Sequence, residues 1–368
     1  MPRSPNAVDF WRGCALVTIS IDHVPGNHYV DYTLHNFAFS DASEVFVFLA
    51  GWAMRLVADS RTARANPAAA HWKVLRRSGE LYVAQIIISL LALALTILAA
   101  NLLNAPFIYD WNGAAPVFNS PLLGLIGIFT LFTQLGYFNI LPLYVILMMM
   151  APVFTMIYRA KPVLLLPVSL ALYVVVLTFS LNLPTWPEEG RWFFDPFSWQ
   201  FIFVLGFLLG GNTGLGGWAR RHIKPLFWLS LPLLAIGLYV NVYNIRINPI
   251  NVPSPKLFFI FDKTFLSPAR IISMLALAAA VARVFPFIYR MLKWPVEIMS
   301  KLGRNSLNVF CVGSLVSLIG QFYRYGVGGG WINDTFIVGI TLLILWITAW
   351  FTEWHSQRPH LTAPLSSA

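Results

Sequence analysis

Residues 81–103 have the sequence LYVAQIIISLLALALTILAANLL, which contains no charged side chain. A helix needs about 20 mostly apolar residues to cross the hydrocarbon core of a bilayer, and this run is long enough. The whole chain has the same character, because 58% of its 368 residues are hydrophobic and only 11% are charged. Soluble proteins carry about 25% charged residues. The sequence therefore predicts an integral membrane protein.

Similar apolar runs recur along the chain and predict an all-α polytopic membrane protein of about ten transmembrane helices. The runs are 7–24, 41–58, 78–103, 137–158, 162–182, 198–212, 225–243, 266–286, 305–323 and 333–352. The polar stretches between them are too short to form a separate soluble core, so we expect one domain over residues 1–368. The apolar, glycine-interrupted segment 121–135 is predicted to be a re-entrant or interfacial helix.

The distribution of Lys and Arg predicts the orientation of the chain. With the N-terminus in the cytoplasm, the inner loops and termini hold 17 of the 25 Lys and Arg residues, and the outer loops hold 5. Cytoplasmic segments of membrane proteins carry such an excess of positive charge. We therefore expect both termini in the cytoplasm. The net charge of +10 then reflects membrane topology, and nucleic acid is not an expected partner.

The first predicted helix carries ionisable side chains at both ends of WRGCALVTISIDH, residues 11–23. Eleven helical steps of about 100° place Arg12 and His23 on one face, about 16 Å apart along the axis. Ionisable side chains inside a membrane usually face the bundle interior or a wet cavity. This face therefore offers a cation near the cytoplasm and a candidate general base deeper in the bilayer. A lipid-snorkelling Arg12 and a structural His23 are the alternatives.

Further candidate residues lie near the ends of other predicted helices. Glu44 starts the second run near the end of the first, so it could orient the His23 imidazole or bind an acceptor hydroxyl. Asp22 could also orient His23, or it could cap a helix. Three cations precede the third run and could bind phosphate, since arginine forks match phosphate oxygens, or could be ordinary cytoplasmic charge: Lys73, Arg76 and Arg77.

Two more groups could contact an acyl group or a sugar. Asp262 and Lys263 precede the eighth run and Arg270 lies inside it, where they could bind a carboxylate or a sugar, or form a structural ion pair. Trp199 and Gln200 could stack on and hydrogen-bond a sugar, or belong to the interfacial aromatic belt. No metal site is predicted, because the outer-loop histidines, His28 and His35, have no matching Cys or carboxylate cluster.

Several of these motifs resemble a known superfamily. Arg12, ten residues and then His23 resemble the Arg-X10-His signature of membrane acyltransferases of the acyltransferase-3 superfamily. SEVFVFLAGWAMR at 43–55 resembles its second helix, and HWKVLRRSGELY at 71–82 resembles the basic start of its third. More narrowly, the chain resembles the OpgC branch, through six motifs in order: IDH at 21–23, SEVFVFLAGW at 43–52, NILPLYVILMMMAP at 139–152, FDPFSWQFIFVLG at 194–206, DKTFLSPARII at 262–272 and LGRNSLNVFC at 302–311.

The resemblance implies a function. OpgC-like proteins transfer succinyl groups from cytoplasmic acyl-CoA to osmoregulated periplasmic glucans, so we expect an acyltransferase-3-like bundle in a bacterial inner membrane. Acyl-CoA would be the donor substrate, periplasmic glucan the acceptor and membrane lipids the surroundings, with no permanently bound cofactor. His23 would deprotonate a sugar hydroxyl or carry the acyl group itself. A monomer and a homo-oligomer are both compatible with the sequence.

Two other classes of function compete with an acyltransferase. A glucan or sugar transporter or flippase would be expected to have paired broken helices and intramembrane carboxylates. A non-catalytic partner of glucan synthesis would not need His23. Because Arg12 and His23 share one helix face, the sequence favours an enzyme with an anionic donor.

Overall fold

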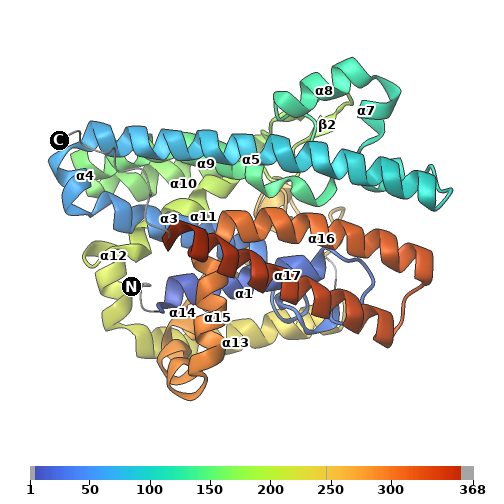
Figure 1. The fold of residues 1–368 in the computed structure, drawn as a ribbon. Helices are drawn as coiled ribbons and strands as arrows, with labels where there is room; N and C mark the ends of the chain where they lie inside the picture. Colours follow the sequence, from blue (N-terminus) through green and yellow to red (C-terminus); the bar gives the residue numbers. More distant parts are fainter. Residues whose placement is uncertain (1–4, 246, 358–368) are drawn as a thin grey trace, which may run out of the picture.

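The computed structural model describes residues 5–245 and 247–357, apart from the side chains of His35 and Gln357. The described chain is almost entirely helical (Figure 1). Ten long helices occupy the positions of the ten predicted runs: α1 (Ala7–Asp22), α3 (Ala42–Ala58), α5 (Pro67–Leu102), α9 (Ile140–Ala160), α10 (Pro162–Phe179), α11 (Pro196–Gly210), α13 (Ile223–Val242), α14 (Pro268–Met291), α16 (Ser306–Val327) and α17 (Trp331–Gln357). The predicted positions of these helices are therefore confirmed.

Shorter elements connect the long helices. They are η1 (Val30–Tyr32), α2 (Leu34–Phe37), α4 (Arg61–Ala65), α6 (Ile108–Trp111), α7 (Ala115–Asn119), α8 (Pro121–Phe129), η2 (Gly136–Phe138), α12 (Gly214–Arg221), η3 (Lys256–Phe258), α15 (Lys293–Arg304) and the antiparallel pair β1 (Pro184–Thr185) and β2 (Gly190–Arg191). The nine residues of α8 rise only about 14 Å. This helix of segment 121–135 is therefore too short to cross a membrane, as expected.

Seven helices of the described chain are long and apolar enough to cross a membrane by themselves. They are α5, α9 with the preceding η2, α10, α13, α14, α16 and α17. The predicted first, second and sixth spans fall short of that length, because α1, α3 and α11 have 16, 17 and 15 residues. α11 bends by 68° into α12, and this pair together forms an eighth candidate. The structure therefore indicates a multi-pass membrane protein, and ten spans stay a prediction.

The interior helices cross each other closely at four glycines. Gly51 and Gly206 lie at the crossing of α3 with α11, and Gly13 and Gly303 lie at the crossing of α1 with α15. A Cβ atom at any of these positions would overlap a backbone carbonyl oxygen of the other helix. Small residues allow this close approach between helices in membranes. The crossings hold α1 and α3 firmly inside the bundle.

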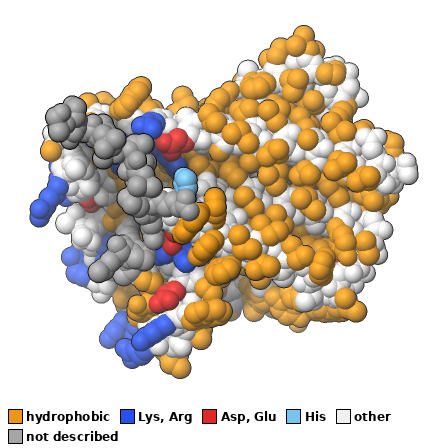
Figure 2. Space-filling model, in the orientation of Figure 1, with side chains coloured by type: hydrophobic (Ala, Val, Ile, Leu, Met, Phe, Trp, Pro, Cys, Tyr) orange, Lys and Arg blue, Asp and Glu red, His pale blue; other side chains and the backbone are white. Residues whose placement is uncertain are grey.

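Charged side chains gather at one end of the molecule, at the left in Figure 2, whereas hydrophobic side chains cover most of the rest of this face. The same end holds α4, α12, the start of α1 and the end of α17 (Figure 1). α4 and α12 carry cations of the predicted cytoplasmic loops, Arg61 and Arg64 on α4 and Arg220 and Arg221 on α12. The predicted inner loops therefore share one end. Arg3, Arg246 and Arg358, which also entered the orientation argument, lie outside the described residues.

Candidate functional site

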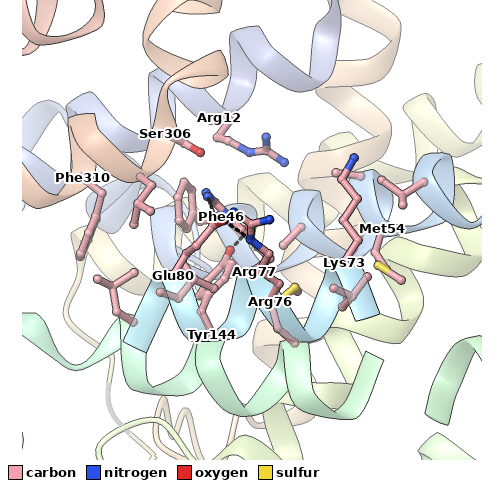
Figure 3. Close-up of a pocket in the computed structure, with 18 residues that line it drawn as sticks. Arg12, Phe46, Met54, Lys73, Arg76, Arg77, Glu80, Tyr144, Ser306 and Phe310 are labelled. Atoms are coloured by element: carbon pink, nitrogen blue, oxygen red, sulfur yellow. Dashed lines mark hydrogen bonds and ion pairs between the residues drawn. The ribbon is translucent and has the colours of Figure 1, made fainter. Parts of the chain in front are cut away.

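A cavity of about 530 Å³ lies between α1, α3, α5, α9 and α16 (Figure 3), and we call it the cationic cavity. Its lining includes Arg12, Lys73, Arg76 and Arg77, so the structure brings together all four residues predicted to bind a phosphate-bearing donor. Together with Glu80, the lining side chains carry four positive charges and one negative charge. Cavities of this size are typical of small-molecule sites. The excess of positive charge favours an anionic ligand.

The cations enter the cavity from two sides. Figure 3 shows Arg12 on one side of the cavity, with Arg76 and Arg77 across from it. Arg12 Nη2 donates a hydrogen bond to the Leu49 carbonyl oxygen at 3.1 Å, which ties the guanidinium to α3. Arg77 Nη1 lies 2.8 Å from Glu80 Oε2, and Arg76 Nε lies 3.7 Å from Glu80 Oε1. A guanidinium matches the geometry of phosphate oxygens. This arrangement can therefore hold phosphate groups.

The rest of the lining is mostly apolar and was not predicted. Phe46, Tyr144 and Phe310, each in the second turn of its helix, give the cavity aromatic walls from α3, α9 and α16. The Tyr144 hydroxyl donates to the Phe46 carbonyl oxygen at 2.6 Å, so its polar group is satisfied. Ser306, the first residue of α16, also lines the cavity. Such walls suit a flexible, weakly polar chain attached to a charged head.

His23 follows α1 as its C-terminal capping residue. Its imidazole stacks on the ring of Tyr137, with centroids 4.5 Å apart and an interplanar angle of 27°. Gln321 Nε2 donates to the His23 carbonyl oxygen at 2.6 Å. Among the described residues, His23 Nδ1 is buried without a hydrogen-bond partner, and so is Asp22 Oδ1. No bond therefore joins Asp22 Oδ1 to His23 Nδ1, and the ring contact of the imidazole is with Tyr137.

Four charged side chains form an ion-pair network between α3 and the start of α14. Lys263 Nζ lies 2.6 Å from Asp41 Oδ2, Arg270 Nη2 lies 3.3 Å from the same oxygen, and Arg270 Nε lies 2.5 Å from Glu44 Oε1. Asp41 and Glu44 also form a capping box, since Glu44 Oε2 accepts the Asp41 N–H at 2.9 Å. Two cations therefore compensate two carboxylates at a helix N-terminus.

Glu44 was predicted to orient the His23 imidazole or to bind an acceptor hydroxyl, and the network defines its contacts. Glu44 is fully buried, and its two oxygens bind Arg270 and the Asp41 N–H. The direct role predicted for Glu44, orienting His23, is therefore not what its contacts provide. Asp41 was not predicted as a site residue. The spacing of Asp41 and Glu44 in DASE, typical of a capping box, could have indicated it.

Trp199 and Gln200, which were predicted to contact a sugar, lie inside the protein. Trp199 is fully buried, and its Nε1 donates to the carbonyl oxygens of Lys263 at 3.2 Å and Thr264 at 3.1 Å. Gln200 is also fully buried and donates to the Ser169 carbonyl oxygen at 3.0 Å. Neither side chain is exposed, so these contacts give no support to the predicted sugar-binding role. Trp199 instead fixes the segment that carries Lys263.

Asp262 has a local structural role. Its Oδ1 accepts the Phe265 N–H at 2.7 Å, and its carbonyl oxygen accepts the Ser267 N–H at 3.0 Å. These bonds form the turn before α14. The neighbouring Lys263 is the partly exposed member of the ion-pair network, with about a third of its side chain accessible. Asp262 therefore shapes the turn, whereas Lys263 contributes its charge to the network.

His28, in the loop after α1, contacts two residues of α17. His28 Nδ1 lies 2.6 Å from Asp334 Oδ2, and its ring stacks on Trp331 at 4.4 Å. Within the part of the chain that the structure describes, three or more His, Cys, Asp or Glu side chains that could hold a metal ion do not come together. The side chain of His35, the other histidine considered for a metal, lies outside that part. His28 therefore fastens the loop after α1 to α17.

A family model places this arrangement of residues among known proteins. The model of the OpgC protein family matches residues 3–357. The chain belongs to the OpgC protein family. Membership of the OpgC family, together with the apolar helices, indicates a multi-pass membrane protein related to osmoregulated periplasmic glucans and suggests a transferase role. Comparisons with curated proteins and with solved structures gave no match.

Proposed function

We propose that the protein is a membrane O-acyltransferase. It moves an acyl group, with succinyl as the expected one, from cytoplasmic acyl-CoA across the inner membrane onto hydroxyl groups of osmoregulated periplasmic glucan. The observation that carries the proposal is the convergence of Arg12, Lys73, Arg76 and Arg77 on one cavity. Membership of the OpgC family supports the same reaction class.

The helix α1 connects the donor site to the reactive group. Arg12 lies in the cationic cavity, and His23 ends the same helix about 16 Å further along. Phosphates bound at Arg12 would leave the thioester arm free to extend along the apolar walls toward His23. Because the helix keeps the two side chains on one face, Arg12 can bind the phosphates of a donor while His23 lies at its thioester.

In the proposed reaction, the neutral His23 imidazole accepts the proton of a sugar hydroxyl while the sugar oxygen attacks the thioester carbonyl carbon. The tetrahedral intermediate collapses, the bond from carbon to sulfur breaks, and the CoA thiolate takes the proton from the imidazolium. The products are the sugar ester and CoA. A route through acyl-His23 gives the same products in two steps. Tyr137, whose ring stacks on the imidazole, would hold it in place.

The test is release of free CoA from succinyl-CoA or acetyl-CoA by the purified protein, with and without periplasmic glucan. Loss of a general base lowers the rate by about 10²–10⁴-fold, so His23→Ala should lose glucan-dependent release. The control is His222→Ala, because His222 is exposed beside α12 at the charged end. Full activity of His23→Ala would contradict its role. No release by the wild type from either donor would contradict the acyltransferase and favour a transporter.

A further inference from the structure

A second cavity, which we call the polar cavity, adjoins the cationic cavity on the side of α4. It has a volume of about 640 Å³ and lies between α1, α3, α4 and α5. Its polar lining includes Asn6, Asp9, Ser60, Thr62 and Asn66. The two cavities share Arg12 and Lys73, which therefore stand at their junction.

The two cavities follow one another along the helix axes. On α5, the polar cavity is lined up to Lys73, and the cationic cavity is lined from Lys73 to Leu81. On α3, which runs in the opposite direction, only the cationic cavity extends as far as Phe46. On α9, which lines only the cationic cavity, the lining begins at Leu141, four residues after Tyr137, whose ring stacks on that of His23. The cationic cavity therefore points toward His23, and the polar cavity points away from it.

We propose that the polar cavity binds the nucleotide half of the acyl-CoA donor, an inference that rests on the proposed function and deepens it. An acyl-CoA consists of a nucleotide, a diphosphate and a long arm that ends in the thioester. The arm belongs in the cationic cavity, because only this cavity extends toward His23. The diphosphate then lies at the junction with Arg12 and Lys73, and the nucleotide occupies the polar cavity.

The side chains of the polar cavity fit this ligand. Asp9 is buried, and its Oδ2 accepts a hydrogen bond from Asn6 Nδ2 at 2.5 Å, so the carboxylate is held in place. A carboxylate can accept hydrogen bonds from ribose hydroxyls or from the adenine amino group. Asn66 Oδ1 accepts the Ala69 N–H at 3.0 Å and caps α5, which fixes the orientation of its amide. Leu56 and Ala70 add apolar surface for a flat base.

The opposite orientation of the donor conflicts with the geometry. A nucleotide in the cationic cavity would place the thioester arm in the polar cavity, among Ser60 and Thr62 of the α4 region. The thioester would then point toward the charged end and away from His23. A reaction at His23 therefore requires the nucleotide in the polar cavity.

Photolabelling of the wild-type protein tests the assignment without any variant. The probe is 8-azidoadenosine 3′,5′-bisphosphate, which carries the nucleotide without the arm, and the labelled peptides are identified by mass spectrometry. We expect label in peptides of α1 or of the α4–α5 region, and we expect CoA to compete for it. Label confined to α9 or α16, or label that CoA does not displace, would overturn the proposal.

A cavity-filling variant gives an independent measurement. Ala70→Trp inserts a large ring into the polar cavity, whereas Ala68→Trp changes an exposed residue of the same turn that lines neither cavity. Overpacking weakens binding by about 10- to 100-fold, so Ala70→Trp should bind CoA and adenosine 3′,5′-bisphosphate correspondingly less tightly. The Ala68→Trp control should bind both like the wild type.

The short donor succinyl-pantetheine separates the two proposals, because it lacks the nucleotide. Ala70→Trp should turn over succinyl-pantetheine at a rate close to the wild-type rate while its turnover of succinyl-CoA falls. Equal loss with both donors, or unchanged CoA binding, would overturn the nucleotide assignment and leave the proposed function intact. If the wild type turns over neither donor, the proposed function fails, and the assignment fails with it.

Discussion

Replacement of Arg270 by Met should destabilise the folded protein, because it leaves the Glu44 carboxylate buried without its cation. Arg270 Nε lies 2.5 Å from Glu44 Oε1, and Glu44 is fully buried. Removing one partner of a buried ion pair costs about 3–5 kcal/mol in the free energy of unfolding. With an unfolding entropy of about 2.1 cal/mol/K per residue, this loss lowers the Tm by about 4–7 °C. The methionine keeps much of the side-chain length, so the effect reports the charge.

A double-mutant cycle shows whether the effect arises in the pair. Glu44→Gln alone should also destabilise, but Glu44→Gln combined with Arg270→Met should lose about 0.5–3 kcal/mol less than the sum of the single variants. The assay is thermal unfolding in detergent, followed by tryptophan fluorescence and checked by size-exclusion chromatography. Arg221→Met, at an exposed position of α12, is the control.

Two results would refute this reasoning. A Tm of Arg270→Met equal to that of the Arg221→Met control would show that the buried pair does not stabilise the fold. An unchanged Tm together with a raised KM for succinyl-CoA would show that Arg270 binds the acyl carboxylate. If the losses in the free energy of unfolding are strictly additive in the cycle, Arg270 and Glu44 do not stabilise the fold through their contact with each other.

Tyr137→Ala should lower kcat by about 2- to 10-fold, because a stacked ring pair contributes about 0.5–1.5 kcal/mol to the placement of His23. Tyr137→Phe keeps the ring and should keep the activity. An equal loss of kcat in both variants would contradict the stacking role. Arg12→Ala should raise the KM for acyl-CoA by about 10- to 100-fold through loss of a charged hydrogen bond, and an unchanged KM would remove Arg12 from the donor site. Gly206→Val should abolish the yield of monodisperse protein in detergent, because its Cβ would overlap the backbone of α3, whereas Gly339→Val has open space and should purify normally. A monodisperse, active Gly206→Val protein would show that this crossing is looser.

Hydropathy located the ten long helices because an uncharged run inside a membrane protein has few alternatives to a helix. It did not locate their ends equally well. α5 begins at Pro67, eleven residues before the predicted start at 78, because Asn66 caps the helix and proline is favoured in its first turn. Hydropathy also missed α15, an amphipathic helix that packs against α1. An apolar run is enough to predict a helix. An amphipathic helix can be predicted only when the surface that it covers is known.

The candidate site was predictable where one helix carries it. The separation of Arg12 and His23 follows from helix geometry, and the basic residues before the third run indicated the wall opposite Arg12. The pairing of Glu44 with Arg270 joins positions 226 residues apart, which a single sequence does not reveal. The burial of Trp199 was missed, because an aromatic residue at a helix end has the same pattern whether it faces lipid or protein. Tyr137 lies in a short 3-10 turn whose sequence gives no sign of its contact with His23.

The close crossing of α1 with α15 fixes the position of α1 in the bundle. Because Gly13 and Gly303 bring the two backbones into contact, α1 cannot slide or rotate without separating from its neighbour. The rise of the helix itself sets the separation of about 16 Å between Arg12 and His23, and the crossing fixes where both residues lie in the bundle. In the proposed reaction, this fixed separation selects donors by the length of the thioester arm. It does not discriminate between acyl groups at the end of that arm. A donor with a shortened arm would dock by its phosphates, stop short of His23 and act as a competitive inhibitor.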